Sequence, residues 1–313
     1  LMTQSIISFE KLRNKDVAVV GGKNASLGEM ISQLKAKGVR VPTGFATTAD
    51  AFNDFLSQNQ LGTKIEEELK DLDINDVVKL AESGKKIRKW ILDTPFSKEL
   101  ETNIKSHYEN LLDKSPNGTT FAVRSSATAE DLPDASFAGQ QESFLNIHGI
   151  DNIKQAIKEV FASLYNDRAI SYRVHKNFIH SEVAISAGIQ QMVRSDMGSS
   201  GVMFTIDTES GFKDVIFITS SYGLGETVVQ GAVNPDEFYV HKSLLKLKKN
   251  AIVRKSIGSK KIKMVFSEDT KAGLSTNTVD VEEDLSNQFS INESDVKELA
   301  EYAMIIESHY GCP

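Results

Sequence analysis

The chain has 313 residues, of which 40% are hydrophobic, and a formal net charge of −7 at pH 7. This length suffices for a full hydrophobic core and suggests about two domains or lobes. The acidic balance argues against a general nucleic-acid binder, and no stretch approaches the roughly 20 apolar residues of a membrane span. Cys312 is the only cysteine, which excludes a disulfide framework or a zinc cluster within the chain. The N-terminus lacks a basic segment followed by an apolar one, so we expect no signal peptide and a cytoplasmic protein.

The first chemically informative stretch is the turn around Lys23. An apolar run at 17–20 predicts a short strand, and the apolar residues after it recur at helical spacing. Two glycines and Lys23 lie between the two elements. Glycines let a backbone approach an anion, and a helix N-terminus attracts negative charge, so this turn is a candidate phosphate site. The spacing differs from that of a Walker A loop, and on these residues alone a plain strand-to-helix turn is the alternative.

The next stretch predicts a strand and a layer of packing helices. Residues 41–48 read as a strand, and the Thr48 hydroxyl is placed to cap a helix that starts at Ala49. Residues 64–112 are mostly charged, with apolar positions at helical spacing, and they carry no pattern that points to chemistry.

A second candidate phosphate site follows the apolar run at 121–123. We expect a strand there, with Arg124 at its end and a long loop of small residues after it. A rigid guanidinium beside such a loop is typical of phosphate binding. The loop also carries Glu130, Asp131 and Asp134, which suit a divalent cation or simple solvation. A surface loop with a paired arginine is the alternative.

Two further strands are predicted at 143–147 and 183–193, with a helix between them that Asp151 would cap. Gln190 and Met192 share one face of the second strand because side chains alternate along it. A glutamine amide and a thioether suit the edge and the face of an adenine ring. An ordinary core glutamine with satisfied hydrogen bonds is the alternative.

The last third predicts a strand pair at 201–207 and 214–219. Three acidic residues follow it and suit a metal, a ribose, or turns and caps: Glu226, Asp236 and Glu237. Residues 242–263 are rich in lysine and predict a solvated β-hairpin, with an anion-binding patch as the alternative. A polar loop is expected at 267–286, and then a helix capped by Asn292.

Three stretches together resemble a known family. They read Val-Gly-Gly-Lys-Asn-Ala-Ser-Leu-Gly-Glu-Met at 20–30, Arg-Ser-Ser-Ala-Thr-Ala-Glu-Asp at 124–131 and Ala-Ser-Phe-Ala-Gly-Gln-Gln-Glu at 135–142. They look like the signature of the PEP/pyruvate-binding ATP-grasp domain, which opens phosphoenolpyruvate synthase, pyruvate phosphate dikinase and rifampin phosphotransferase. The resemblance extends over essentially the whole chain, through Asn-Pro-Asp-Glu-Phe at 234–238.

The resemblance implies an α/β (α+β) fold of the two-lobed ATP-grasp type, which we expect to divide into domains 1–115 and 116–313. It implies Mg²⁺ and ATP as ligands, with Lys23 and Arg124 as catalytic residues. The implied ATP-binding residues are Lys23, Arg124, Gly139, Ser143, Gln190 and Met192. In the family an acidic metal ligand and a Gln-x-Arg segment close the ATP site further along the chain. We therefore expect the metal ligand to lie beyond Pro313 and this chain to be an incomplete fragment.

Among the family's enzymes the resemblance is closest to phosphoenolpyruvate synthase. This implies conversion of pyruvate, ATP and water to phosphoenolpyruvate, AMP and phosphate, through a phosphohistidine on a downstream domain and a further pyruvate-binding domain. The six histidines of this chain do not lie in the motif of that phosphocarrier, so we expect the fragment alone to be inactive. The alternatives are the ATP-binding domain of rifampin phosphotransferase or pyruvate phosphate dikinase, or a nucleotide-binding module without turnover.

Overall fold

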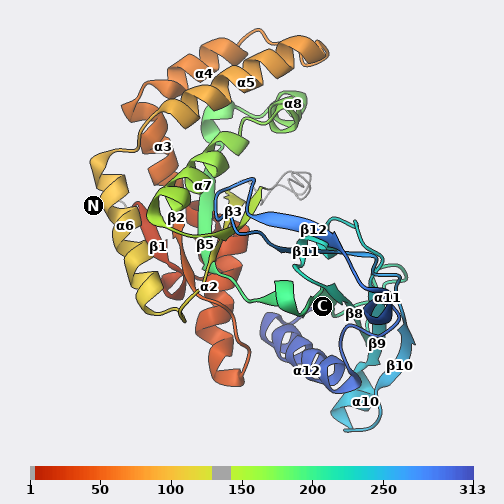
Figure 1. Ribbon diagram of the computed structural model, residues 1–313. Coiled ribbons are helices and arrows are strands. Elements are labelled where there is room, and N and C mark those ends of the chain that lie inside the picture. Colours follow the sequence, from red (N-terminus) through yellow and green to blue (C-terminus); the bar gives the residue numbers. More distant parts are fainter. Residues whose placement is uncertain (1–3, 129–141) are drawn as a thin grey trace. The chain divides into compact units, whose positions relative to one another are not determined.

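A computed structural model describes residues 4–128 and 142–313 (Figure 1). The chain divides into two compact units. Unit 1 comprises Leu1–Lys35, Arg40–Met192 and Asp269–Ser275, and unit 2 comprises Ala36–Val39, Val193–Glu268 and Thr276–Pro313. The domain boundary proposed between residues 115 and 116 falls inside unit 1. Both units mix helices and strands, in agreement with the predicted α/β class.

Unit 1 contains one sheet and eight α-helices among the described residues. Its strands are β1 (Ile6–Ser8), β2 (Gly44–Thr47), β3 (Phe121–Ala127), β4 (Ser143–Ile147) and β5 (Ile185–Gln191). Its helices are α1 (Val17–Val20), α2 (Gly22–Leu34), α3 (Ala49–Gln58), α4 (Leu61–Leu69), α5 (Val77–Asp93), α6 (Lys98–Asp113), α7 (Ile150–Ser163) and α8 (Asp167–His175).

The sheet of unit 1 has the order β1-β2-β5-β3-β4, and all neighbouring strands are antiparallel. One face is strongly apolar, since Phe45, Val123 and Ile189 on it join the main hydrophobic cluster with residues of α3 to α7. The aromatic rings of Phe52 on α3 and Phe161 on α7 pack edge to face within the cluster. This side supplies most of the buried core of the unit.

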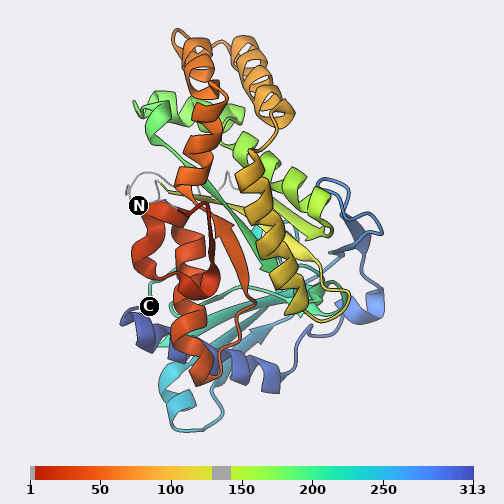
Figure 2. The same ribbon diagram turned by 90° about the vertical axis from the view of Figure 1, so that its left-hand side faces the viewer.

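The opposite face of the same sheet carries small and polar side chains, and α2 packs on it. A second cluster there joins Val20, Ala25 and Ile31 to Ala46 of β2. Figure 2 shows the red helix α2 and the yellow helix α6 on opposite sides of the sheet. We call this side, where α2 packs, the α2 face.

The edge strand β4 is covered by residues that come much later in the chain. Ser275 Oγ donates a hydrogen bond to the Leu145 carbonyl (2.5 Å), and Asn146 Nδ2 donates one to the Ser275 carbonyl (2.9 Å). The His148 N–H also donates to the Thr270 carbonyl (3.4 Å). The segment Asp269–Ser275 therefore completes unit 1 although the chain on either side of it belongs to unit 2.

Unit 2 is built on a second antiparallel sheet with the order β10-β9-β8-β6, where β7 also pairs with β8. Its strands are β6 (Ser199–Ser200), β7 (Met203–Phe204), β8 (Val215–Tyr222), β9 (Asp236–His241), β10 (Ile252–Ser256), β11 (Ile262–Phe266) and β12 (Thr276–Asp280), the last two forming a separate hairpin. Its helices are α9 (Glu226–Val229), α10 (Lys242–Lys246), α11 (Glu283–Ser286) and α12 (Glu293–Tyr310). Apolar residues of α12 pack with those of β8 and β9.

Several predicted elements are confirmed. The Thr48 hydroxyl accepts from the Ala51 N–H (3.1 Å) and caps α3, and Asn292 caps α12 in a reciprocal pair with Asp295. The strands at 143–147 and within 183–193 are β4 and β5. No helix within 4–128 or 142–313 has the length and apolar character needed to cross a lipid bilayer.

Other expectations were wrong. Residues 17–20 form α1 rather than a strand, because the chain turns back at Gly21, whose N–H bonds the Val17 carbonyl (2.8 Å). Arg124 lies in the middle of β3, since pairing with β5 extends the strand to Ala127. Gly149, not Asp151, is the N-cap of α7. The lysine-rich stretch begins with α10, and the expected loop at 267–286 contains β12 and α11.

Candidate functional site

The register of three strands gathers the candidate residues of unit 1 on the α2 face. Arg124 of β3 lies directly opposite Ser143 of β4 on one side and Gly188 of β5 on the other. Cross-strand partners project from the same face of a sheet, and so do residues two apart on one strand. Arg124, Ser143 and Gln190 therefore belong to one face, although they are distant in sequence.

Gln190 holds the Arg124 side chain. Its Oε1 accepts a hydrogen bond from Arg124 Nη1 (2.8 Å), and its Nε2 donates to the Pro42 carbonyl (2.8 Å). Only 7% of Gln190 is exposed, so both ends of the amide are occupied in a buried setting. This agrees with the alternative of a satisfied buried glutamine, and it fixes the direction in which the guanidinium extends.

The corner between α1 and α2 lies tightly against the same face. Gly21 adopts φ +80°, and a Cβ there would lie 2.1 Å from Ser126 Oγ of β3. A Cβ on Gly188 would likewise lie 2.2 Å from Asn24 Oδ1. Glycines at both positions thus allow the start of α2 to approach the sheet as closely as backbone atoms permit. Lys23, in the first turn of α2, is exposed.

Met192 and Ser143 are half-buried. The Met192 sulfur accepts a hydrogen bond from the Asn146 N–H (3.0 Å), which ties the end of β5 to β4. Gly139 and the acidic residues Glu130, Asp131 and Asp134 lie outside the described residues. The structure therefore brings the neighbourhoods of Lys23, Arg124, Ser143 and Gln190 together on one face.

Sequence reasoning missed the buried residues beneath this surface. Asn24 is 3% exposed, and its Nδ2 donates to the Val20 carbonyl (3.0 Å) and to Ser186 Oγ (3.0 Å). Ser186 Oγ in turn donates to the Thr47 carbonyl (2.5 Å). One signal in the sequence could have indicated Asn24. An asparagine in the first turn of a helix competes with the backbone for hydrogen bonds unless its side chain has another partner.

The three acidic residues left open by the sequence take separate places in unit 2. Asp236 is fully buried beside the fully buried Lys260, whose ammonium lies 2.6 Å from the carboxylate. Asp236 also accepts from the Gly258 N–H and from Ser290 N–H and Oγ, so its oxygens are used internally. Glu226 opens α9 and accepts from Gln230, and Glu237 lies on β9. Within the described part of the chain, no three His, Cys, Asp or Glu side chains gather as a metal site.

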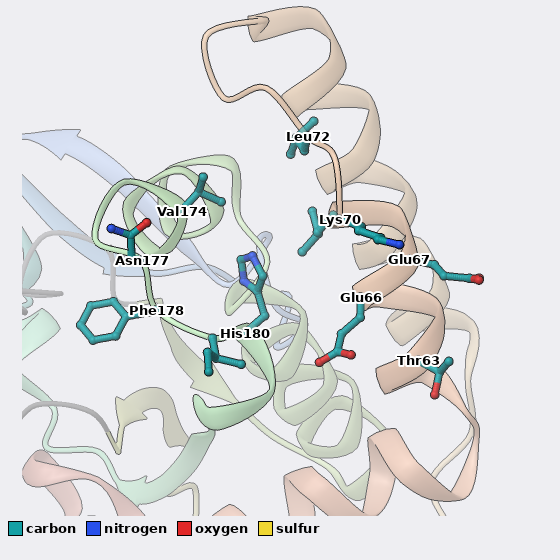
Figure 3. Close-up of a pocket in the computed structure, with 11 residues that line it drawn as sticks. Thr63, Glu66, Glu67, Lys70, Leu72, Val174, Asn177, Phe178 and His180 are labelled. Carbon is teal, nitrogen blue, oxygen red and sulfur yellow. The ribbon is translucent and has the colours of Figure 1, made fainter.

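A cavity of about 560 Å³ lies elsewhere in unit 1, between α4 and the segment from Val174 to His180 (Figure 3). His180, one of its lining residues, accepts a hydrogen bond at Nδ1 from Nε of the fully buried Arg173 (3.0 Å). Burial, together with the nearby guanidinium, lowers the pKa of His180 to about 4. Burial raises the pKa of Tyr165, beneath that guanidinium, to about 12. The lining does not include Lys23, Arg124 or Gln190, so the cavity is separate from the site on the α2 face.

Comparison with known proteins shows which family this chain belongs to. The family model described as "Pyruvate phosphate dikinase, AMP/ATP-binding domain" matches residues 17–313. The chain belongs to this family. The match begins at α1 and so includes the corner before α2, the Arg124 strand and all of unit 2 that follows them.

Three relatives show how far the similarity extends. The chain is 62% identical over 309 residues to the phosphoenolpyruvate synthase of Neisseria meningitidis serogroup B, covering 98% of this chain and 39% of the relative. It is 58% identical over 308 residues to that of Escherichia coli K12, with the same coverage of both chains. It is 41% identical over 322 residues to the probable phosphoenolpyruvate synthase of Staphylothermus marinus, covering 98% and 38%. The chain therefore spans about two fifths of the length of these relatives.

Proposed function

We propose that this chain binds ATP on the α2 face of unit 1. One observation carries the proposal: a single sheet face combines the Arg124 guanidinium, the Ser143 hydroxyl and a glycine-flanked helix start that bears Lys23. Positive charge and the backbone N–H groups of a helix start suit a polyphosphate. The printed family description, which names AMP and ATP, supports the same ligand.

We further propose that the parent protein is a phosphoenolpyruvate synthase with an ATP-grasp fold in this region. It would convert pyruvate, ATP and water to phosphoenolpyruvate, AMP and phosphate, and the β-phosphoryl group would pass to a histidine on another domain. The names of the relatives support this activity over phosphate transfer to rifampin.

Within this reaction the residues of the chain act by electrostatics. The Lys23 ammonium and the Arg124 guanidinium would offset the negative charge that shifts between phosphates as the bond to the leaving AMP breaks. Gln190 would keep the guanidinium aimed, and Gly139 and Ser143 would add donors to phosphate oxygens. Mg²⁺ normally accompanies ATP, but within residues 4–128 and 142–313 no acidic cluster forms a site for it, and no step is assigned to the metal.

The test of ATP binding is calorimetric titration of ATP and AMP into the chain, with and without Mg²⁺. We expect Arg124→Ala to weaken ATP binding about tenfold or more, since a hydrogen bond to a charged group is worth about 1.5–3 kcal/mol. AMP, which lacks the two outer phosphates, should lose much less. An equal loss for both nucleotides would contradict the phosphate role of Arg124. Turnover of the full-length parent with pyruvate, against rifampin, tests the reaction itself.

A further inference from the structure

The side chain of Asn24 occupies an unusual place for a polar group in the first turn of a helix. It is buried against the sheet, whereas the adjacent Lys23 is exposed, because successive helical residues point in different directions. An amide has no charge of its own to offer a phosphate and, at 3% exposure, it does not reach one. Its partners show what it does instead.

The Asn24 side-chain nitrogen donates two hydrogen bonds that stabilise the corner between α1 and α2. One goes to the Val20 carbonyl at the end of α1 and the other to Ser186 Oγ on β5, both at 3.0 Å. Ser186 Oγ in turn donates a hydrogen bond to the Thr47 carbonyl of β2. A single side chain thus joins α1, α2 and two neighbouring strands.

The opposing surface fits this one side chain. Gly188 lies under Asn24 Oδ1, and any larger residue there would place its Cβ 2.2 Å from that oxygen. Gly188 is also the cross-strand partner of Arg124. The contact between Asn24 and Gly188 therefore joins the residue next to Lys23 to the residue opposite Arg124.

We infer that Asn24 is a positioning residue that sets the place of Lys23 relative to Arg124 on the α2 face. This inference rests on the proposed function, in which both cations act on the phosphates of ATP. Groups that stabilise shifting charge must be held within about 0.5 Å of their working positions by buried partners. Asn24 supplies that support for the helix start, and Gln190 supplies it for the guanidinium.

The experiment is a double-mutant cycle on ATP binding, measured by calorimetry on the full chain. Asn24→Asp keeps the shape of the side chain but removes both N–H donors and places a carboxylate against the Val20 carbonyl. We expect it to weaken ATP binding about tenfold and AMP binding less than about twofold, since only ATP engages Lys23 through its outer phosphates. In a Lys23→Ala background the same change should cost less than about twofold for ATP, because the residue it positions is already absent.

The matched control is Asn103→Asp. Asn103 also donates from Nδ2 to a serine hydroxyl, that of Ser5 at 2.8 Å, but it lies on α6, away from the α2 face. It should change the melting temperature without changing the ratio of ATP to AMP affinity.

The outcomes separate the two proposals. Independent, additive losses from Asn24→Asp and Lys23→Ala, or equal losses for ATP and AMP, would overturn the positioning role while leaving ATP binding intact. Absence of ATP binding by the unaltered, folded chain would overturn the proposed function and this inference with it. Non-additive loss confined to ATP supports both.

Discussion

At the scale of single residues, the two ends of the Gln190 amide decide how Arg124 can act. The oxygen accepts from the guanidinium and the nitrogen donates to the Pro42 carbonyl, so the amide is oriented before any ligand is considered. The family resemblance implies that a glutamine here meets adenine, whereas these contacts connect it to Arg124, for which we propose a phosphate-binding role. The two roles make different demands on the nucleotide.

Replacement of Gln190 separates those roles. We expect Gln190→Leu, which keeps the approximate volume but removes the acceptor, to weaken ATP binding more than AMP binding, because a misdirected Arg124 serves the outer phosphates poorly. The loss of a hydrogen bond to a charged group corresponds to about 1.5–3 kcal/mol of ATP binding free energy. Titration with ATP, AMP and adenosine is the measurement. If all three weaken by the same factor, Gln190 acts on the base.

His180 gives unit 1 a defined response to acid. Its pKa in the folded protein is about 4, below the usual value of 6.5, because burial and Arg173 oppose a second positive charge. Between these values the unfolded chain binds a proton that the folded chain does not. The free energy of unfolding therefore falls as the pH drops from about 6.5 to 4. Solvent screening at this partly exposed ring limits the effect to about 1–2 kcal/mol.

We expect His180→Asn to lose less stability than the unaltered chain between pH 7 and pH 4.5, because its amide oxygen accepts from Arg173 without titrating. Denaturant unfolding at both pH values measures the difference. The exposed His175→Asn is the control and should follow the unaltered chain. If His180→Asn follows it as well, His180 is not the residue responsible.

At the scale of elements, the corner between α1 and α2 depends on a glycine twice over. Gly21 needs φ +80° and also lies where a Cβ would be 2.1 Å from Ser126 Oγ. We expect Gly21→Ala to lower the free energy of unfolding by about 3 kcal/mol, with backbone strain and overpacking both contributing. Gly118→Ala, at φ +84° with open space around it, isolates the strain and should cost only about 1 kcal/mol. Equal losses in thermal or denaturant unfolding would show that the contact with Ser126 adds nothing.

The elements that the sequence predicts well are those with a strong local pattern. The last helix carries an apolar face and a capping pair at Asn292 and Asp295, and the strand with Gln190 is mostly apolar before it, with Ser186 as the one polar residue. The valine-rich run at 17–20 favours a strand by composition, yet no sheet partner takes it and it turns into α1. β12 is missed because four of its five residues are exposed and it has no apolar face to read.

In the candidate site, too, the sequence predicts what depends on a local motif and misses what depends on tertiary contacts. Motifs make Lys23 and Arg124 candidates for the ATP site, but the link from Arg124 to Gln190 follows from strand register, which a single sequence does not reveal. The support from Asn24 and Ser186 is likewise tertiary. It joins residues 162 positions apart and depends on the absence of a side chain at Gly188.

At the scale of the whole molecule, the chain spans about two fifths of the length of the relatives it matches. We expect the purified chain to form no phosphoenolpyruvate from ATP and pyruvate, because the proposed reaction needs a carrier histidine and a pyruvate site on other domains. A coupled assay with a sensitive phosphoenolpyruvate readout is the measurement, with the full-length parent as the positive control. Product from the purified chain would show that the chemistry is contained within these 313 residues.

The chain passes between its two units several times, which a search for a single boundary does not anticipate. Unit 1 needs three separate segments, the last of them Asp269–Ser275. A cut between 115 and 116 would divide its sheet, since β3 pairs with β5 and β5 pairs with β2. Discontinuous units of this kind are recognised from contacts in space and not from composition along the sequence.

The cover that Asp269–Ser275 gives to β4 also sets an order of events during synthesis. All five strands of the sheet have left the ribosome once Gln191 has emerged, but the partners of Leu145 and Asn146 come only with Ser275. Translation at about 5–20 residues per second leaves this edge bare for several seconds in every nascent chain. An uncovered edge strand pairs readily with other strands, so slow codons before Ser275 would lengthen the interval in which newly made chains associate wrongly.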